Sequence, residues 1–327
     1  MSKTQMRFLT DDEKARHKHP YSFQVTNFSS LGFYPEGTFH VPDGFFHADE
    51  EIAFSVAWSG SWEKLDPELP YSELRTLSPD HLRLVAAVMF CEKRDGPRLT
   101  LYPLPDQNLI LTHRRLDLES PKVIQEIRSL VIQELQSLNG KQSRWDQHCT
   151  LARPYELWPP KEFALERLES FWQNLNPLDY KIARGVHALM KADMLSTHRE
   201  FWEEATISCY VALDASFSHI KELLAEKGNA NATAHDAALW LHEHFDAPFG
   251  LPQPDASAKY FEEMYEQRIM TLHPSSRLGE FPIPPMMYED YMFLRRQLRE
   301  IFAYFVAGKH GDDYYNDVAE ASRFRIG

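Results

Sequence analysis

The chain has 327 residues, of which 43% are hydrophobic and 13% aromatic, and its formal net charge is -13. This composition supports well-buried cores, enough for two domains, and argues against wholesale disorder. The net negative charge argues against a general electrostatic grip on DNA or RNA, so nucleic-acid chemistry would need a local basic pocket.

Membrane and secretion signals are absent from the sequence. No run of about 18 apolar residues occurs, which predicts no membrane span. The N-terminus lacks the apolar core of a secretory signal peptide, so we expect a cytoplasmic protein. The cysteines Cys91, Cys149 and Cys209 form no CxxC pair and are typical of free thiols in a reducing compartment.

The N-terminal part is rich in β-branched and aromatic runs bounded by turn-forming residues. These runs predict strands at 21–28, 51–60, 82–91, 98–104 and 108–113. A helix is predicted at 120–138, with Ser120 as N-cap and Pro121 at the first helical position. Residues 1–150 therefore predict an α+β domain of unknown role, and no catalytic constellation stands out in it.

A Pro-rich segment without clear periodicity, 151–163, predicts a linker. Beyond it the pattern is helical, with helices predicted at 161–175, 177–195, 199–226, 233–246, 257–273 and 287–307. We therefore expect an all-α domain over 161–308, followed by a polar C-terminal tail at 309–327.

One arginine interrupts the apolar side of the predicted helix 257–273. At about 100° per residue, one stripe contains Phe261, Met264, Tyr265, Arg268 and Leu272. Because a bare guanidinium is costly to bury, Arg268 must reach solvent, pair with an acid, or line a crevice where a partner helix lies.

Asp214 is the best candidate for that acid. It lies near the apolar stripe of the predicted helix 199–226. A carboxylate among apolar residues on a neighbouring helix is what a half-buried Arg268 needs. The alternative is that Asp214 faces solvent at the edge of the stripe.

His273 marks the predicted end of the helix that carries Arg268. It precedes Pro274, and the residue before a proline disfavours helical backbone. Unpaired carbonyls at a helix C-terminus favour the charged imidazolium. The loop that follows adds Ser275 and Arg277, side chains that could contact a phosphate.

The arginine and histidine resemble the motif of the HEPN superfamily, helical bundles with an arginine, four to six residues and then a histidine. Here it reads Arg268-Ile-Met-Thr-Leu-His273. Tyr265 also resembles the tyrosine of the Tyr-x-x-Arg that precedes the motif in the ApeA-like branch. The run ALDASF, which contains Asp214, is similar to that group's first core helix. The likeness covers residues 177–308, and it implies a HEPN-like helical bundle.

The resemblance also implies a chemistry. Two copies of the motif would face each other across a homodimer interface formed by the helical domain. The 2'-hydroxyl of RNA would attack the adjacent phosphate, with His273 as general acid or base and Arg268 stabilising the phosphorane. Neither a metal nor a cofactor is expected. Such relatives act in stress, toxin or anti-phage settings, which makes RNA or a nucleotide in a local cleft the expected partner.

Two alternatives to the endoribonuclease remain open, and the sequence does not decide whether the chain is an enzyme. One is a non-catalytic module that binds a nucleotide or a protein in the same crevice, and the other is a dimeric scaffold. Both are favoured by the net charge, by Ile269 where active members carry a polar residue, and by Pro274. The pair His242 and His244 ranks lower, because an i, i+2 spacing does not put both rings on one helix face.

Overall fold

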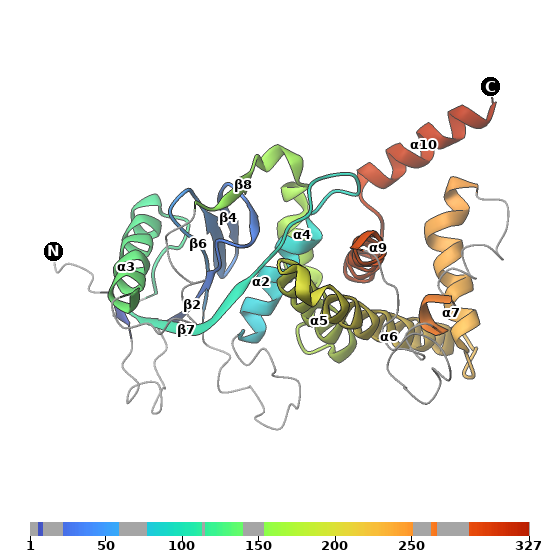
Figure 1. Ribbon diagram of the computed structural model, residues 1–327, viewed down its shortest axis with the longest axis horizontal. Coiled ribbons are helices and arrows are strands. Elements are labelled where there is room, and N and C mark those ends of the chain that lie inside the picture. Colours follow the sequence, from blue (N-terminus) through green and yellow to red (C-terminus); the bar gives the residue numbers. More distant parts are fainter. Residues whose placement is uncertain are drawn as a thin grey trace. The chain divides into compact units, whose positions relative to one another are not determined.

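The computed structural model describes residues 6–8, 22–58, 77–112, 115–139, 154–250, 263–266 and 288–326. The chain divides into two compact units, residues 1–178 and residues 179–327. The first contains an antiparallel sheet with helices, and the second is mostly helical (Figure 1). The expectation of an α+β region followed by a helical region is confirmed at this level.

An antiparallel sheet forms the centre of the first unit. In the described residues its strand order is β1-β7-β2-β6-β5-β4. The strands are β1 (Arg7–Phe8), β2 (Ser22–Phe28), β4 (Gly37–Val41), β5 (Gly44–Ala48), β6 (Ala53–Trp58) and β7 (Pro103–Leu111). A separate parallel pair joins β3 (Phe33–Pro35) to β8 (Glu156–Trp158).

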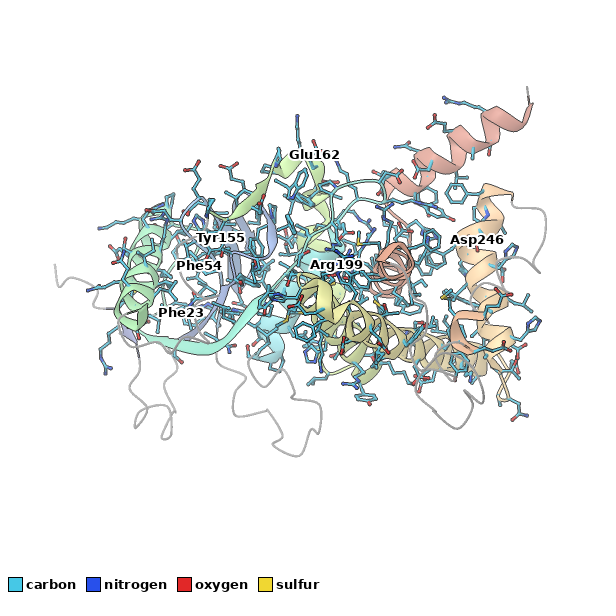
Figure 2. The ribbon with its side chains drawn as sticks, viewed as in Figure 1. Phe23, Phe54, Tyr155, Glu162, Arg199 and Asp246 are labelled. Atoms are coloured by element: carbon cyan, nitrogen blue, oxygen red, sulfur yellow. The ribbon has the colours of Figure 1, made fainter. Side chains whose placement is uncertain are left out.

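β2 is buried on both sides because helices cover both faces of the sheet. Phe23 and Val25 share one core with α3 (Pro121–Asn139), and Figure 2 shows Phe23 and Phe54 on the side of α3. The alternate residue Gln24 faces α2 (Pro79–Phe90), where its Oε1 lies 2.8 Å from His81 Nδ1. The strict side-chain alternation of a strand thus sends neighbouring residues to two different helices.

The prediction of a strand at 82–91 is wrong, because these residues form α2. Ser78 caps the helix by accepting a hydrogen bond from the His81 amide, and Pro79 occupies the first helical position. Nearly every residue from His81 to Phe90 is buried. A helix buried all round shows no polar stripe, so its apolar run could not be distinguished from a buried strand.

Two further differences concern the strands. Of the predicted strand 98–104, only the last two residues belong to β7, while Thr100 forms an isolated bridge with Phe33. The β4–β5 hairpin was not predicted from the sequence, although its strands pair directly from Gly37–Ala48 to Val41–Gly44. The predicted strands 21–28 and 51–60 and the predicted helix 120–138 are confirmed as β2, β6 and α3.

The buried His81 predicts an acid-sensitive first unit. Burial lowers the pKa of His81 from 6.5 to about 4. The unfolded chain therefore takes up this proton first as the pH falls. The stability that the neutral imidazole contributes is complete above about pH 6.5 and is lost towards pH 4, about 3 kcal/mol in all. We expect urea unfolding between about pH 7 and pH 5 to show this loss in the wild type and a smaller loss in His81→Gln. Equal losses in the two proteins would contradict the prediction.

The unit boundary lies further along the chain than the expected linker. β8 pairs with β3, and Tyr155 Oη donates to the Phe28 carbonyl at 3.1 Å. Both contacts place this part of the Pro-rich segment in the first unit. The predicted helix 161–175 is divided into two 3-10 turns and the short α4 (Leu168–Asn174).

The second unit is built around two long helices, α5 (Tyr180–Ser196) and α6 (Trp202–Glu226). Both pack against α9 (Tyr288–Ala307), while α7 (Ala234–Leu241) packs against α6 and continues into one π-helical turn. Gly185 of α5 lies directly against the ring of Phe302, so a larger residue there would displace that ring. The predicted helices 177–195, 199–226, 233–246 and 287–307 are confirmed.

The tail beyond the predicted bundle is also helical. It forms α10 (Asp312–Ile326), and its buried Tyr314 bonds to the carbonyls of His244 and Phe245, each at 3.0 Å. None of the helices in the described part of the chain is long and apolar enough to cross a membrane.

A buried ion pair joins α5 to α9. Arg295 Nη2 lies 2.8 Å from Asp193 Oδ2, and Arg295 Nε donates to Asp193 Oδ1 at 3.0 Å. Both side chains are almost entirely shielded from solvent, with exposed fractions of 1% and 0%. Tyr291 Oη adds a hydrogen bond of 2.9 Å to the same carboxylate. The pair is therefore bidentate and fully hydrogen-bonded on its acidic side, as burial of charge requires.

Candidate functional site

Of the residues predicted to form the site, Asp214 and Tyr265 lie within the described part of the structure. Arg268, His273, Ser275 and Arg277 lie outside the described residues. The site is therefore built here from α6, which carries Asp214, and from the helical segment 263–266, which carries Tyr265.

Tyr265 packs directly on α6. Its ring stacks on the ring of Phe217, with centroids 5.1 Å apart and an interplanar angle of 5°. Phe217 is buried, so this contact anchors the segment 263–266 to the core of the helical unit. Tyr265 thus packs on a residue that lies one helical turn from Asp214 on α6, since residues three apart on a helix are neighbours.

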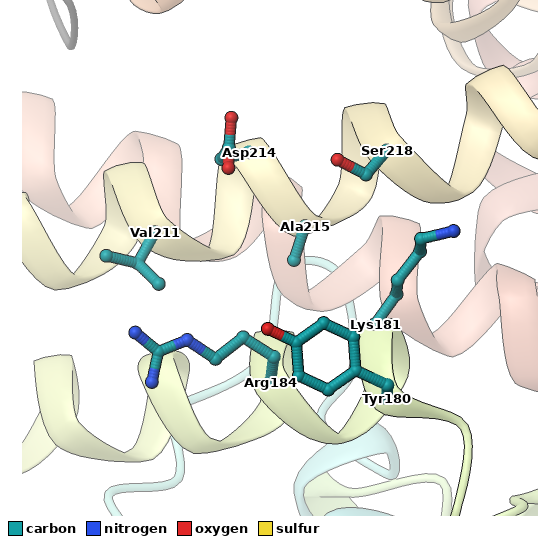
Figure 3. A pocket seen from close by; sticks show the side chains of 7 residues that line it. All are labelled: Tyr180, Lys181, Arg184, Val211, Asp214, Ala215 and Ser218. Atoms are coloured by element: carbon teal, nitrogen blue, oxygen red, sulfur yellow. The ribbon is translucent and has the colours of Figure 1, made fainter. Parts of the chain in front are cut away.

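Asp214 lines a pocket between α5 and α6 with a volume of about 350 Å³. α6 contributes Val211, Asp214, Ala215 and Ser218, and α5 contributes Tyr180, Lys181 and Arg184 (Figure 3). Asp214 is half-buried, while Leu213 and Phe217 beside it are fully buried. It therefore lies at the edge of the apolar stripe.

The two cations of the pocket differ in their pairing. Lys181 forms an ion pair with Glu222. Arg184 forms no ion pair with any residue in the ranges that the structure describes. Its positive charge affects the neighbouring His187, whose pKa is lowered to about 4, chiefly by burial and secondly by Arg184. Arg184 is therefore the main source of unneutralised positive charge in the pocket.

Sequence reasoning did not find Tyr180 and Arg184 as site residues. The only local signal is their i, i+4 spacing on α5, which matches the i, i+4 spacing of Asp214 and Ser218 on α6. Each pair lies on one face of its helix. That the two faces meet is a consequence of helix packing, which no local pattern contains.

A hydroxyl–imidazole–carboxylate chain occurs in the first unit. Thr38 Oγ1 lies 2.7 Å from His47 Nδ1, and His47 Nε2 lies 2.9 Å from Asp49 Oδ2. Burial alone would raise the pKa of Asp49, but hydrogen bonds from Arg128 and His47 outweigh it and lower this pKa to about 2. Thr38 and His47 are cross-strand partners in the β4–β5 hairpin, and Arg128 belongs to α3. This series of hydrogen bonds therefore links the edge strand β4 to the covering helix α3.

The two histidines of the π-helical turn are also accounted for by packing. His242 is buried with Nδ1 4.0 Å from Asp246 Oδ2, and His244 stacks on Trp240 with centroids 3.9 Å apart. No group of three or more His, Cys, Asp or Glu side chains in the described ranges is arranged to hold a metal ion.

Comparison of the chain with protein-family models, with curated proteins and with solved structures finds no match.

Proposed function

We propose that the protein is a metal-independent endoribonuclease of the HEPN type. The single observation that carries this proposal furthest is the stacking of Tyr265 on Phe217. It holds the segment just before the Arg268–His273 motif against the helix that bears Asp214.

The spacing on the two segments extends this support. Arg268 follows Tyr265 by three residues, and Asp214 precedes Phe217 by three residues. We therefore propose that Arg268 and Asp214, each three residues along the chain from one of the stacked rings, form an ion pair. The half-buried Asp214 carboxylate then neutralises the guanidinium, which removes most of the cost of placing Arg268 on an apolar stripe.

The proposed reaction needs only a proton carrier and a cation. A histidine takes the proton of the 2'-hydroxyl, whose oxygen forms a bond to the adjacent phosphorus while the bond to the 5'-oxygen breaks. A second imidazole gives a proton to the leaving oxygen, which makes a homodimer with two His273 side chains the natural active form. Arg268 stabilises the charge on the phosphorane. Ser275 and Arg277 are placed beside the phosphate in this proposal.

Wild-type protein is expected to cut single-stranded RNA in the presence of EDTA. The products should carry 2',3'-cyclic phosphate and 5'-hydroxyl ends, because the attacking group is the neighbouring hydroxyl. The control is the same oligonucleotide with 2'-O-methyl groups, which should survive, as DNA should, because both lack a free 2'-hydroxyl. Cutting that requires Mg²⁺, or that leaves 5'-phosphate ends, would reject this mechanism.

The second candidate function is a non-catalytic module that binds a nucleotide in the same helical unit. It is favoured by the pocket around Arg184, which offers a guanidinium beside the aromatic ring of Tyr180. It is also favoured by Ile269 and Pro274, which depart from the motif of active relatives. Binding of RNA without cutting of any RNA would place this function first. Either function suits a stress, toxin or anti-phage role in the cytoplasm.

A further inference from the structure

We propose that the α5–α6 pocket binds one nucleotide of an RNA strand, with Arg184 on its phosphate and Tyr180 against its base. This inference rests on the proposed endoribonuclease function, since it assigns the nucleotide next to the cleaved bond to a defined place. The pocket is large enough for a single small ligand, at about 350 Å³.

Arg184 supplies the anion contact. It is half-buried in the pocket wall and has no carboxylate partner within the described ranges. A guanidinium presents a planar fork of N–H donors that matches two phosphate oxygens. Because the protein as a whole carries a charge of -13, RNA can be attracted only at such local cationic points.

Tyr180 supplies an apolar surface beside this cation. Its side chain is 48% exposed, and Figure 3 shows its hydroxyl directed towards the arm of Arg184. Single-stranded RNA is bound in proteins by stacking of unpaired bases on aromatic rings next to a cationic groove. Tyr180 and Arg184 lie one turn apart on the same face of α5, a separation that suits a base and its own phosphate.

Neither acidic group at the pocket forms an ion pair with Arg184. Glu222 is engaged by Lys181, so that pair is neutral. Asp214 lines the pocket from the α6 side (Figure 3) and forms no ion pair with Arg184. We assign to the pocket a nucleotide that neighbours the cleaved phosphate, because no histidine is among the described residues that line the pocket.

The test uses the full-length His273→Ala protein, so that RNA is not consumed, and a fluorescein-labelled single-stranded oligoribonucleotide. Fluorescence anisotropy gives Kd at several salt concentrations. Adding Arg184→Gln should weaken binding about tenfold and reduce the salt slope by about one. Tyr180→Leu should weaken binding by a similar factor at an unchanged salt slope, whereas Tyr180→Phe should bind normally because the stacking surface is kept.

The matched control is Arg199→Gln, which removes one exposed arginine of the same unit outside the pocket. It should leave Kd within about twofold, because an exposed charge away from the strand is screened by salt. Circular dichroism melting must show that every variant is folded.

The outcomes separate this inference from the nuclease proposal. If RNA binds and the wild type cuts, but Arg184→Gln behaves like Arg199→Gln, the pocket assignment is overturned and the nuclease proposal stands. If the wild type does not cut but Arg184→Gln and Tyr180→Leu still weaken binding, the pocket stands and the nuclease proposal fails. If the His273→Ala protein without further substitutions does not bind RNA, the pocket assignment is overturned.

Discussion

Asp193→Ala is expected to lower the free energy of unfolding of the helical unit by about 3–5 kcal/mol. The substitution leaves the guanidinium of Arg295 buried, with an exposed fraction of 1%, and removes the carboxylate that accepts hydrogen bonds from its Nε and Nη2 atoms. It also removes one of the two acceptors near the Tyr291 hydroxyl, the other being Ser196 Oγ. Removal of one partner of a buried ion pair is among the few single changes with an effect of this size.

Hydrogen exchange of backbone amides in the full-length protein can locate the loss of stability caused by Asp193→Ala. Peptides from α5 and α9 should lose protection, and peptides from β2 and β6 should keep it. The matched control is Glu126→Ala, which breaks the exposed pair of Lys122 and Glu126 on α3, where the side chains are 85% and 41% exposed. That change should cost less than about 0.5 kcal/mol.

A double variant tests whether the charge itself is responsible. Asp193→Leu combined with Arg295→Met removes both charges and keeps a similar volume. Its stability should lie much closer to the wild type than that of Asp193→Ala, because replacement of a buried pair by apolar residues is often neutral. Equal destabilisation by the double variant would show that packing, and not an unpaired charge, explains the loss.

His273→Ala and Arg268→Ala should each reduce RNA cleavage at least about 100-fold, if the proposed mechanism holds. Without His273 no imidazole carries the proton between the 2'-hydroxyl, the leaving oxygen and water. Without Arg268 the developing charge on the phosphorane has no cation beside it. Cleavage is measured in EDTA as the rate of release of 2',3'-cyclic phosphate ends from a labelled oligoribonucleotide.

Controls must separate catalysis from folding and assembly. His235→Ala removes an exposed histidine at the start of α7 and should cut RNA at the wild-type rate. Light scattering should give the same mass for both inactive variants as for the wild type. Cleavage that persists in His273→Ala would assign the activity to a contaminant or to another group.

Elements with an exposed polar face were predicted well from the sequence. α3 has a solvent side, so its apolar stripe is visible in the sequence, and Pro121 marks its start. α5, α6 and α9 were predicted nearly to their ends for the same reason. α2 was mistaken for a strand because both of its sides are buried, and burial on all sides removes the periodicity on which the distinction depends.

The candidate site was likewise predicted only as far as local sequence patterns reach. The Arg268–His273 motif, its tyrosine Tyr265 and the carboxylate of Asp214 were identified from local spacing and from the resemblance alone. The contact of Tyr265 with Phe217 could not be read from that spacing, because it joins residues 48 positions apart.

The sequence by itself determined that an α+β region precedes a helical one, where most helices begin and end, and which residues carry the proposed chemistry. These are local properties, set by caps, prolines and the period of apolar residues. Only the tertiary structure decided that Asp193 meets Arg295, that Gln24 meets His81, and that Arg184 and Asp214 line one pocket. Each of these pairs joins two elements, and their meeting depends on how side chains of both interlock, which neither segment specifies alone.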